Sequence, residues 1–218
     1  MSDDPAPGKP KLVAAKEAWA RAGRLLTGQT ADPARVRLPP GQQRVTDWPV
    51  LDLGSLPTVT TETFRLDIDG AVAHPLRLDW AGLLALPAVA SVSDIHCVTQ
   101  WSRYDNRWTG VATATLIAAV APKDEVGFVI LHAADGYTTN LTRERFQRPD
   151  SLLAYGWNEA PIAPEHGGPA RLVIPSLYFW KSAKWVRRIE FALTDRPGFW
   201  ERRGYHNQGD PWAEERYS

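Results

Sequence analysis

Short strand-like segments recur along this 218-residue chain, without the regular alternation of strand and helix that builds a parallel α/β sheet. Residues 64–70 alternate apolar and polar side chains and end in Asp-Gly, which predicts a strand followed by a turn. Compact apolar or β-branched runs predict further strands at 89–99, 128–133, 137–141, 152–157, 170–174 and 184–193. Together with a few helices, this pattern indicates an α+β fold.

Three segments are predicted to be helical. Over residues 12–26, apolar side chains recur at three- and four-residue steps, which is typical of an amphipathic helix. A shorter helix is predicted over 78–86, beginning at Asp79 and ended by Pro87. Residues 109–120 are helical by composition.

The length of the chain fits one domain, or at most two small ones, and is ample for a large hydrophobic core. We divide it into an N-terminal helix and extended arm at 1–45, a core at 46–195, and a C-terminal tail at 196–218 that packs on the core. Residues 27–43 combine Gly, Pro and Arg without periodicity, which predicts an extended, locally basic connector. The apolar segment 46–56 contains proline and is therefore predicted to be non-helical.

The charges of the chain balance, with 25 Lys plus Arg against 25 Asp plus Glu. Because nucleic-acid binding relies on excess Lys and Arg to displace counterions, no nucleic-acid partner is expected, and an acidic membrane surface is disfavoured for the same reason. No apolar run reaches the roughly 18 to 20 residues that span a bilayer, so no membrane partner is expected either. The polar first residues lack the pattern of a secretory signal, which predicts a cytoplasmic location.

The sequence contains one cysteine, Cys97, which excludes an internal disulfide framework, a four-Cys zinc site and an all-Cys iron–sulfur cluster. Gly-rich phosphate loops and the motifs G-x-S-x-G, H-E-x-x-H and C-x-x-C are absent as well. Cys97 is either a small buried core residue or a reactive thiolate at the end of a strand. A thiolate would bind a soft or high-valent metal, or attack a carbonyl with His132 or His166 as base. His96 would point to the opposite face of the strand.

Two later segments combine cations with glycine or aromatic residues. In residues 165–171, two Gly bring the backbone close to whatever His166 and Arg171 reach, and an Arg fork suits phosphate or another planar anion. The alternative is an ordinary surface turn. Residues 178–185 hold two Lys, one Ser and four aromatic residues, which form either an edge of the core or a slot for a flat heterocycle with an anionic end. Residues 135–140 predict an ordinary hairpin turn.

Three motifs, in this order and spacing, resemble the molybdopterin-binding domain of the sulfite oxidase family. They are His96-Cys97-Val98-Thr99 with Trp101-Ser102, His166-Gly167-Gly168-Pro169 with Arg171, and Lys181-Ser182-Ala183-Lys184-Trp185-Val186. The resemblance covers roughly residues 35–215 and is strongest to the short bacterial sulfite oxidase-like oxidoreductases. It implies a sulfite oxidase-type fold of mixed sheets with few helices in a single domain. It also implies a molybdenum-molybdopterin cofactor, in which one pyranopterin dithiolene holds the metal.

The resemblance also implies the residues that bind this cofactor. Cys97 matches the one protein thiolate that binds molybdenum, and a thiolate is a soft, strongly donating ligand that leaves other coordination positions open. His166 and Arg171 match contacts to the pterin and its phosphate. Further expected cofactor contacts are His96, Thr99, Thr139, Asn140, Ser182 and Lys184.

The reaction that the resemblance implies is two-electron oxygen-atom transfer to or from a small oxyanion or S-oxide. Nearby cations for an anionic substrate are Arg103, Arg107 and Lys181, which together with Cys97 form the expected catalytic set. After the ligand Cys, sulfite oxidases continue with Gly, Asn and Arg, whereas this chain has Val98-Thr99-Gln100-Trp101. A C-x-x-C-H haem motif is absent from the sequence, so a separate electron-transfer partner is expected.

Two other functions stay open on the residues alone. One is a Cys97-dependent hydrolase or other thiol enzyme, which needs a His base close to the thiol. The other is a non-catalytic cofactor-binding or carrier protein. Of the ten Trp residues, Trp101, Trp180 and Trp185 are expected inside or beside the pocket, whereas Trp200 is expected only to pack.

Overall fold

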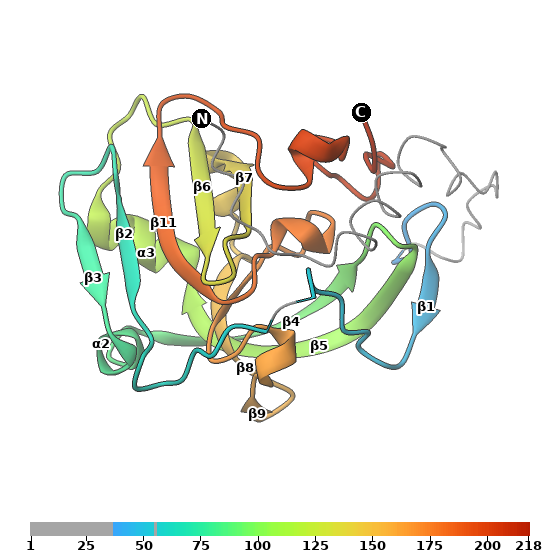
Figure 1. Cartoon of the computed structure of the whole chain (residues 1–218), viewed down its shortest axis with the longest axis horizontal. Coiled ribbons are helices and arrows are strands. Elements are labelled where there is room, and N and C mark those ends of the chain that lie inside the picture. Colours follow the sequence, from blue (N-terminus) through green and yellow to red (C-terminus); the bar gives the residue numbers. More distant parts are fainter. Residues whose placement is uncertain (1–36, 55) are drawn as a thin grey trace.

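The structure is a computed structural model that describes residues 37–54 and 56–218, and two β-sheets form most of it (Figure 1). The predicted helix at 12–26 lies outside the described residues. Both sheets contain parallel and antiparallel strand pairs. Three short α-helices occur in the described residues. This confirms the predicted α+β fold with mixed sheets and few helices.

The first sheet is organised around β5. Its strands are β1 (Gln43–Val45), β4 (Ala88–His96), β5 (Trp101–Ala112), β8 (Leu152–Trp157), β9 (Ala160–Pro161) and β10 (Arg171–Val173). β5 pairs with β1 in parallel and with β4 and β8 antiparallel. β4 and β5 form a hairpin, and its four-residue loop, 97–100, begins with the single cysteine.

The second sheet is organised around β11. Its strands are β2 (Leu66–Gly70), β3 (Leu76–Leu78), β6 (Phe128–Ala133), β7 (Thr138–Thr142) and β11 (Val186–Ala192). β11 lies between β2, to which it is parallel, and β6, to which it is antiparallel. The predicted hairpin is confirmed, because β6 and β7 pair antiparallel across the Asp135-Gly136 turn.

Short helices connect the strands. They are α2 (Trp80–Leu84), α3 (Thr113–Val120), α4 (Arg143–Phe146) and the 3₁₀ turns η1 (Pro164–His166), η2 (Phe179–Lys181) and η3 (Glu201–Arg203). Asp79 caps α2, because its carboxylate accepts a hydrogen bond from the backbone N–H of Gly82 at 2.8 Å. The predicted start of this helix is therefore confirmed.

One continuous hydrophobic core joins the two sheets. Within β2, Leu66 and Ile68 are fully buried whereas Asp67 is half-buried, as the alternating sequence predicts. These two residues belong to the same buried cluster as Val111 of β5 and Leu153 of β8. The cluster holds the sheets together and fixes the loops at their ends.

The prediction of a helix over 109–120 is wrong in its first third, because residues 109–112 are the end of β5 and α3 begins at Thr113. In the middle of β5 buried and exposed positions alternate strictly, as a half-buried strand requires. Two of the buried positions are Asn106 and Gly110, so the apolar alternation is hidden in the sequence. A Cβ on Gly110 would lie 2.3 Å from the carbonyl oxygen of Leu153, so only glycine allows β5 and β8 to pair here.

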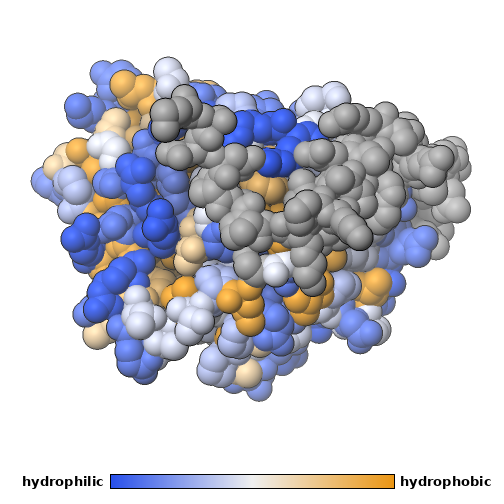
Figure 2. Space-filling view, viewed as in Figure 1, coloured by the Kyte–Doolittle hydropathy of each residue, from blue (hydrophilic) through white to orange (hydrophobic). Residues whose placement is uncertain are grey.

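The C-terminal residues, red in Figure 1, lie against the second sheet on the side of β7. The backbone N–H of Phe199 donates to Thr138 O of β7 at 2.8 Å, and Phe199, Trp200 and Tyr205 are buried. None of the helices that the structure describes is long and apolar enough to cross a membrane. On the face shown in Figure 2, apolar residues form small groups among hydrophilic ones.

Candidate functional site

A cavity of about 120 Å³, partly open to solvent, lies where the β4–β5 hairpin loop meets η2 and the C-terminal residues. Its walls come from segments far apart in sequence: residues 48–53, 97–101, 135–137, 171, 179–185, 200 and 205. A site assembled in this way is characteristic of a ligand pocket between elements of a rigid fold.

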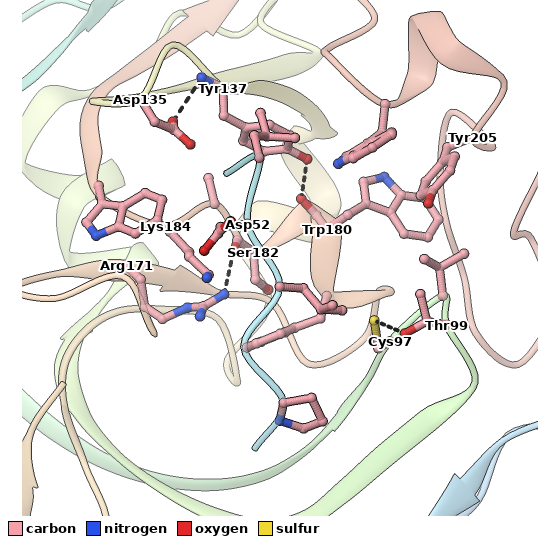
Figure 3. Close-up of a pocket in the computed structure, with 18 of the residues that line it drawn as sticks. Asp52, Cys97, Thr99, Asp135, Tyr137, Arg171, Trp180, Ser182, Lys184 and Tyr205 are labelled. Carbon is pink, nitrogen blue, oxygen red and sulfur yellow. Dashed lines mark hydrogen bonds between the residues drawn. The ribbon is translucent and has the colours of Figure 1, made fainter. Parts of the chain in front are cut away.

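The two ends of the cavity carry different chemistry (Figure 3). One end, which we call the cationic end, comprises Arg171, Ser182 and Lys184. The other, which we call the thiol end, comprises Cys97, Thr99, Trp180 and Tyr205. It also includes Trp101, whose carbonyl accepts from Cys97 N–H, and Trp200, which stacks on Tyr205.

The hairpin loop presents Cys97 at the thiol end. The backbone N–H of Cys97 donates to Trp101 O at 2.8 Å, and Gln100 N–H donates back to Cys97 O at 3.0 Å, which closes a tight turn. Gln100 adopts a positive φ of 71° within this turn. The sulfur of Cys97 lies 3.1 Å from the hydroxyl oxygen of Thr99, and the residue is only 7% exposed. Cys97 therefore combines a buried position with access to the cavity.

His96 points away from the thiol end. Its Nδ1 lies 2.8 Å from the hydroxyl oxygen of Ser102, inside the protein. Burial lowers the pKa of His96 to about 4, so the ring is neutral at physiological pH. His96 does not line the cavity, in agreement with the expected opposite face of the strand.

Aromatic rings form the wall of the thiol end. Trp200 stacks on Tyr205 with ring centroids 4.9 Å apart, and Trp180 meets Tyr205 edge-on at 5.0 Å. Burial raises the pKa of Tyr205 well above its ordinary value, and the nearby Tyr217 and Cys97 add to the shift. The phenol therefore stays protonated at neutral pH. This wall is rigid because the rings pack against one another.

Arg171 organises the cationic end. From β10, its guanidinium donates to His166 O and to Ser182 O, both at 2.7 Å, and lies 4.2 Å above the ring of Phe179. Burial lowers the pKa of Arg171 to about 9. By bonding two carbonyls, Arg171 holds the 166–169 turn and the 182–184 loop next to each other.

Lys184 and Ser182 complete this end. Lys184 Nζ donates to Glu165 O at 2.6 Å, and the hydroxyl of Ser182 accepts from Ile174 N–H at 2.9 Å. A Cβ on Gly167, whose φ is 103°, would lie 2.8 Å from the Cβ of Lys184. Glycine is thus required for the turn to approach Lys184, which explains the first of the two glycines in the second motif.

Two carboxylates share the wall with these cations. Asp135 accepts from Tyr137 N–H at 3.0 Å, and burial raises its pKa. Asp52 accepts from Gly54 N–H at 2.7 Å. Figure 3 shows Asp52 between the cationic end and the middle of the cavity. The residue belongs to the 48–53 segment, which passes along the cavity.

Lys181, Thr139 and Asn140 lie behind the wall of the cavity rather than on it. Lys181 is fully buried, and its Nζ lies 2.6 Å from the Glu201 carboxylate and 2.9 Å from Asn140 O. Thr139 donates to the same Glu201 oxygen at 2.8 Å. Asn140 donates to Asp195 at 2.7 Å. These residues therefore attach the C-terminal residues to β7 and η2, and Lys181 is not placed to meet a substrate.

Arg103 and Arg107 also lie off the cavity. Arg103 donates to Thr46 O at 3.0 Å and lies 4.8 Å above the ring of Trp157. Arg107 is exposed and pairs with Glu159 at 3.2 Å. The reason is geometric, because β5 runs away from the hairpin loop and each residue adds about 3.3 Å of distance.

The two histidines considered as bases for the thiol are likewise elsewhere. His132 pairs with Glu190 at 3.1 Å on the second sheet. His166 stacks flat against Trp48, with ring centroids 3.9 Å apart and planes 7° apart. Neither histidine is among the residues that line the cavity. The arrangement needed for a Cys-His hydrolase is therefore not formed by the described residues.

Several lining residues carry little signal in the sequence. Trp200 was expected only to pack, and Tyr205 comes from the same C-terminal region. Both reach the cavity through long-range packing that no local motif encodes. The Trp surplus was the one hint of an aromatic wall.

The described residues fit a metal that brings most of its ligands with it. They include no group of three or more His, Cys, Asp or Glu that could hold a metal ion. They do offer one thiol on the cavity wall, with cations at the opposite end for an anionic group. The indole N–H of Trp101, which also lines the cavity, is buried and has no hydrogen-bond partner among the described residues. Molybdopterin matches these requirements, since it supplies a dithiolene and a phosphate.

Comparison with known proteins gives the same result. Residues 53–200 match the family described as oxidoreductase molybdopterin binding domain. The chain is 49% identical over 183 residues to the uncharacterized oxidoreductase YuiH of Bacillus subtilis (strain 168), covering 84% of this chain and 92% of that protein.

More distant relatives are longer proteins. The chain is 28% identical over 158 residues to the protein-methionine-sulfoxide reductase catalytic subunit MsrP of Campylobacter jejuni, covering 65% of this chain and 53% of MsrP. It therefore spans about half the length of that relative. Among solved structures, the sulfane dehydrogenase SoxCD from Paracoccus pantotrophus superposes with a TM-score of 0.60 at 22% identity, over 77% of this chain and 56% of that chain. The last likeness shows the fold. Taken with the family match and the relationship to YuiH, it places the chain in the family of oxidoreductases with a sulfite oxidase-type molybdopterin-binding domain.

Proposed function

We propose that this protein catalyses two-electron oxygen-atom transfer on a small sulfur substrate, with Cys97 as the protein ligand of the molybdenum-molybdopterin cofactor. The observation that carries the proposal is the position of the single thiol, buried at one end of a cavity whose other end is cationic. A thiolate suits molybdenum, and Arg171 with Lys184 suits the anionic end of the pterin.

When bound, the cofactor supplies the two-electron redox chemistry. The residues of the chain hold and orient it. Ser182 and Lys184 present a hydroxyl and an ammonium to its anionic end, and Arg171 keeps their loop in place through Ser182 O. At the thiol end, the packed rings of Trp180, Trp200 and Tyr205 form an apolar wall.

The chemistry of the thiol end favours an uncharged S-oxide over an oxyanion such as sulfite. Arg171 and Lys184 are the only Arg or Lys among the described residues on the cavity wall, and both belong to the opposite end. An oxyanion would be desolvated against aromatic rings without a cation to pair with, which is costly. The relative MsrP, named as a protein-methionine-sulfoxide reductase, supports the same substrate class.

In the reductive direction, an S-oxide R₂SO takes up two electrons and two protons and gives R₂S and water. Tyr205 would donate a hydrogen bond to the S-oxide oxygen, because it lines the thiol end and its phenol is protonated at neutral pH. The electrons would come from a separate electron-transfer partner, since the sequence has no haem-attachment motif.

Two measurements test this proposal. Protein from a molybdate-replete host is expected to contain about one molybdenum and one pterin per chain, and to reduce sulfoxides with a reduced dye as donor. A molybdenum content near zero, with no pterin fluorescence after denaturation, would contradict it. A cofactor-loaded protein that turns over neither sulfoxides nor N-oxides nor sulfite would instead be a binding or carrier protein.

A further inference from the structure

The residues just before the family-matched region reach the thiol end. Gln42 precedes β1, lies outside residues 53–200 and is only 4% exposed. The following residue, Gln43, donates its backbone N–H to Gln100 O at 2.8 Å and pairs with Trp101 in register. The backbone of the arm therefore runs alongside the loop that carries Cys97.

The side chain of Gln42 bonds to this loop directly. Its Nε2 donates to the carbonyl oxygen of Cys97 at 3.0 Å, and its Oε1 accepts from the hydroxyl of Ser102 at 3.1 Å. Both bonds are buried. A carbonyl oxygen only accepts, so the amide nitrogen must face Cys97 and the amide oxygen must face Ser102.

A third bond extends this arrangement to His96. The hydroxyl proton of Ser102 is used on Gln42, so Ser102 accepts from Nδ1–H of His96, whose nitrogen is 2.8 Å away. Three bonds then run in one direction, from His96 through Ser102 and Gln42 to the Cys97 carbonyl. Such a chain polarises each of its members and is more rigid than separate pairs.

Backbone hydrogen bonds also hold the Cys97 loop. The Cys97 carbonyl also accepts from Gln100 N–H, but that bond lies within the turn and moves with it. Gln100 has a positive φ, which is unfavourable for a residue with a side chain. The backbone N–H of Gln43 attaches Gln100 to β1, and the side chain of Gln42 attaches the Cys97 carbonyl itself to a residue outside the hairpin.

We propose that Gln42 is a positioning residue for Cys97, and that residues 40–45, which precede the family-matched region, support the thiol end of the cavity. By holding the Cys97 carbonyl, Gln42 fixes the direction of the thiol toward the cavity. Because Arg216 donates to Pro40 O at 2.8 Å, the same arm is also attached to the C-terminal residues. The role of Gln42 in fixing the Cys97 thiol does not depend on which reaction the enzyme catalyses. Its role in turnover rests on the proposed function.

Alkylation of Cys97 tests the first effect without the cofactor. We would produce the full chain in a host that cannot make molybdopterin and measure the rate of reaction with iodoacetamide. Gln42→Met keeps the length of the side chain and removes both bonds, so we expect the rate to rise about tenfold. Gln43→Met, an exposed neighbour on β1 whose backbone bond is unchanged, serves as the matched control. It is expected to react like the wild type.

The cofactor-loaded enzyme tests the second effect. In Gln42→Met we expect a changed Mo(V) electron paramagnetic resonance signal, which a loss of stability alone would not produce. We also expect a lower kcat per bound molybdenum, with little change in KM. A folded Gln42→Met protein with wild-type alkylation and a wild-type signal would overturn the proposal. If this variant does not fold, Ser102→Ala removes two bonds of the chain, the one from His96 and the one that orients the Gln42 amide, and wild-type behaviour of that variant in both measurements would overturn the proposal equally. Altered alkylation in an enzyme that turns over no substrate would leave the role of Gln42 standing and reject the proposed function.

Discussion

The two ends of the cavity are built in different ways. The cationic end comes from one stretch of chain, residues 166–184, and hydrogen bonds from Arg171 to backbone carbonyls hold its loops together. The thiol end draws on the hairpin loop, η2 and the C-terminal residues, which packed aromatic rings and buried polar groups bring together. A contiguous end is local and readable in the sequence, whereas a convergent end depends on the whole fold. Because of this difference, we expect a substitution at one end of the cavity to impair binding at that end and to leave the other end intact.

The largest effect is expected from removing the thiol. A Ser hydroxyl is a much weaker ligand for molybdenum than a thiolate, so Cys97→Ser is expected to lose the metal and all turnover. The cationic end is unchanged and is expected to retain part of the pterin. Metal analysis and pterin fluorescence on the same sample measure the two independently. Loss of pterin in proportion to metal would show that the ends do not bind separately.

The second-largest effect is expected from the buried Lys181–Glu201 pair, which lies behind the thiol end. Lys181→Met leaves the buried Glu201 carboxylate without its cation, and breaking such a pair costs about 3–5 kcal/mol. Burial lowers the pKa of Lys181, and the neighbouring Glu201 carboxylate opposes that shift. We expect a lower unfolding free energy in urea. The double variant Lys181→Met with Glu201→Leu is expected to recover most of it, and failure to recover would mean that the pair is not the cause.

This contrast explains which parts of the structure could be predicted. Strands β6 and β8 coincide with the predicted ranges 128–133 and 152–157, because each is a compact apolar run. β5 was missed because Asn106 and Gly110 occupy buried positions, and their burial depends on neighbouring strands. The sequence therefore predicts a strand when the buried positions of that strand hold apolar side chains.

The same rule holds for the site. Arg171 and Lys184 were predicted from contiguous motifs and line the cavity. Lys181 belongs to the same motif as Lys184. Its partner Glu201 is twenty residues away, and the sequence has no signal for that pairing. Tyr205 is likewise brought to the thiol end by the packing of Trp200 and Trp180. The place of Tyr205 in the cavity could be found only from the structure. The cytoplasmic location of the protein stays a prediction.

A smaller effect is expected at the cationic end. Lys184→Ala removes an ammonium from the wall of the cavity, and the loss of one charge-assisted hydrogen bond weakens retention of the pterin about tenfold. The Mo(V) signal of the molecules that remain loaded is expected to be unchanged, because Cys97 is untouched. Lys123→Ala, on an exposed turn, is the control. A changed signal in Lys184→Ala alone would mean that the two ends are coupled.

His166, close to Arg171 and Lys184 of the cationic end, is expected to make the stability of the protein depend on pH. Burial, followed by the charges of Arg171 and Lys184, lowers the pKa of His166 from 6.5 to about 4. Between these values the unfolded chain binds the proton and the folded one does not, so stability falls as the pH falls from 6.5 to 4. Since His166 is partly exposed, the contribution is about 1 kcal/mol after solvent screening. His166→Gln is expected to flatten the dependence in urea denaturation, whereas the exposed His74→Gln is not. Equal slopes in both variants would remove His166 as the cause.

The smallest expected effect concerns substrate charge at the thiol end. Thr99 lines the cavity beside Cys97, and Thr99→Arg would add the cation that this end lacks. A single, partly exposed ion pair is worth at most about 1 kcal/mol, so we expect the KM for sulfite to fall about two- to fivefold. The KM for an uncharged sulfoxide is expected to stay the same or rise, since the new side chain only takes up space. Thr109→Arg places the same residue on the exposed face of β5 and controls for a change in total charge. If wild-type enzyme already prefers sulfite to sulfoxides, and Thr99→Arg changes neither KM, then the aromatic wall does not select substrates by charge.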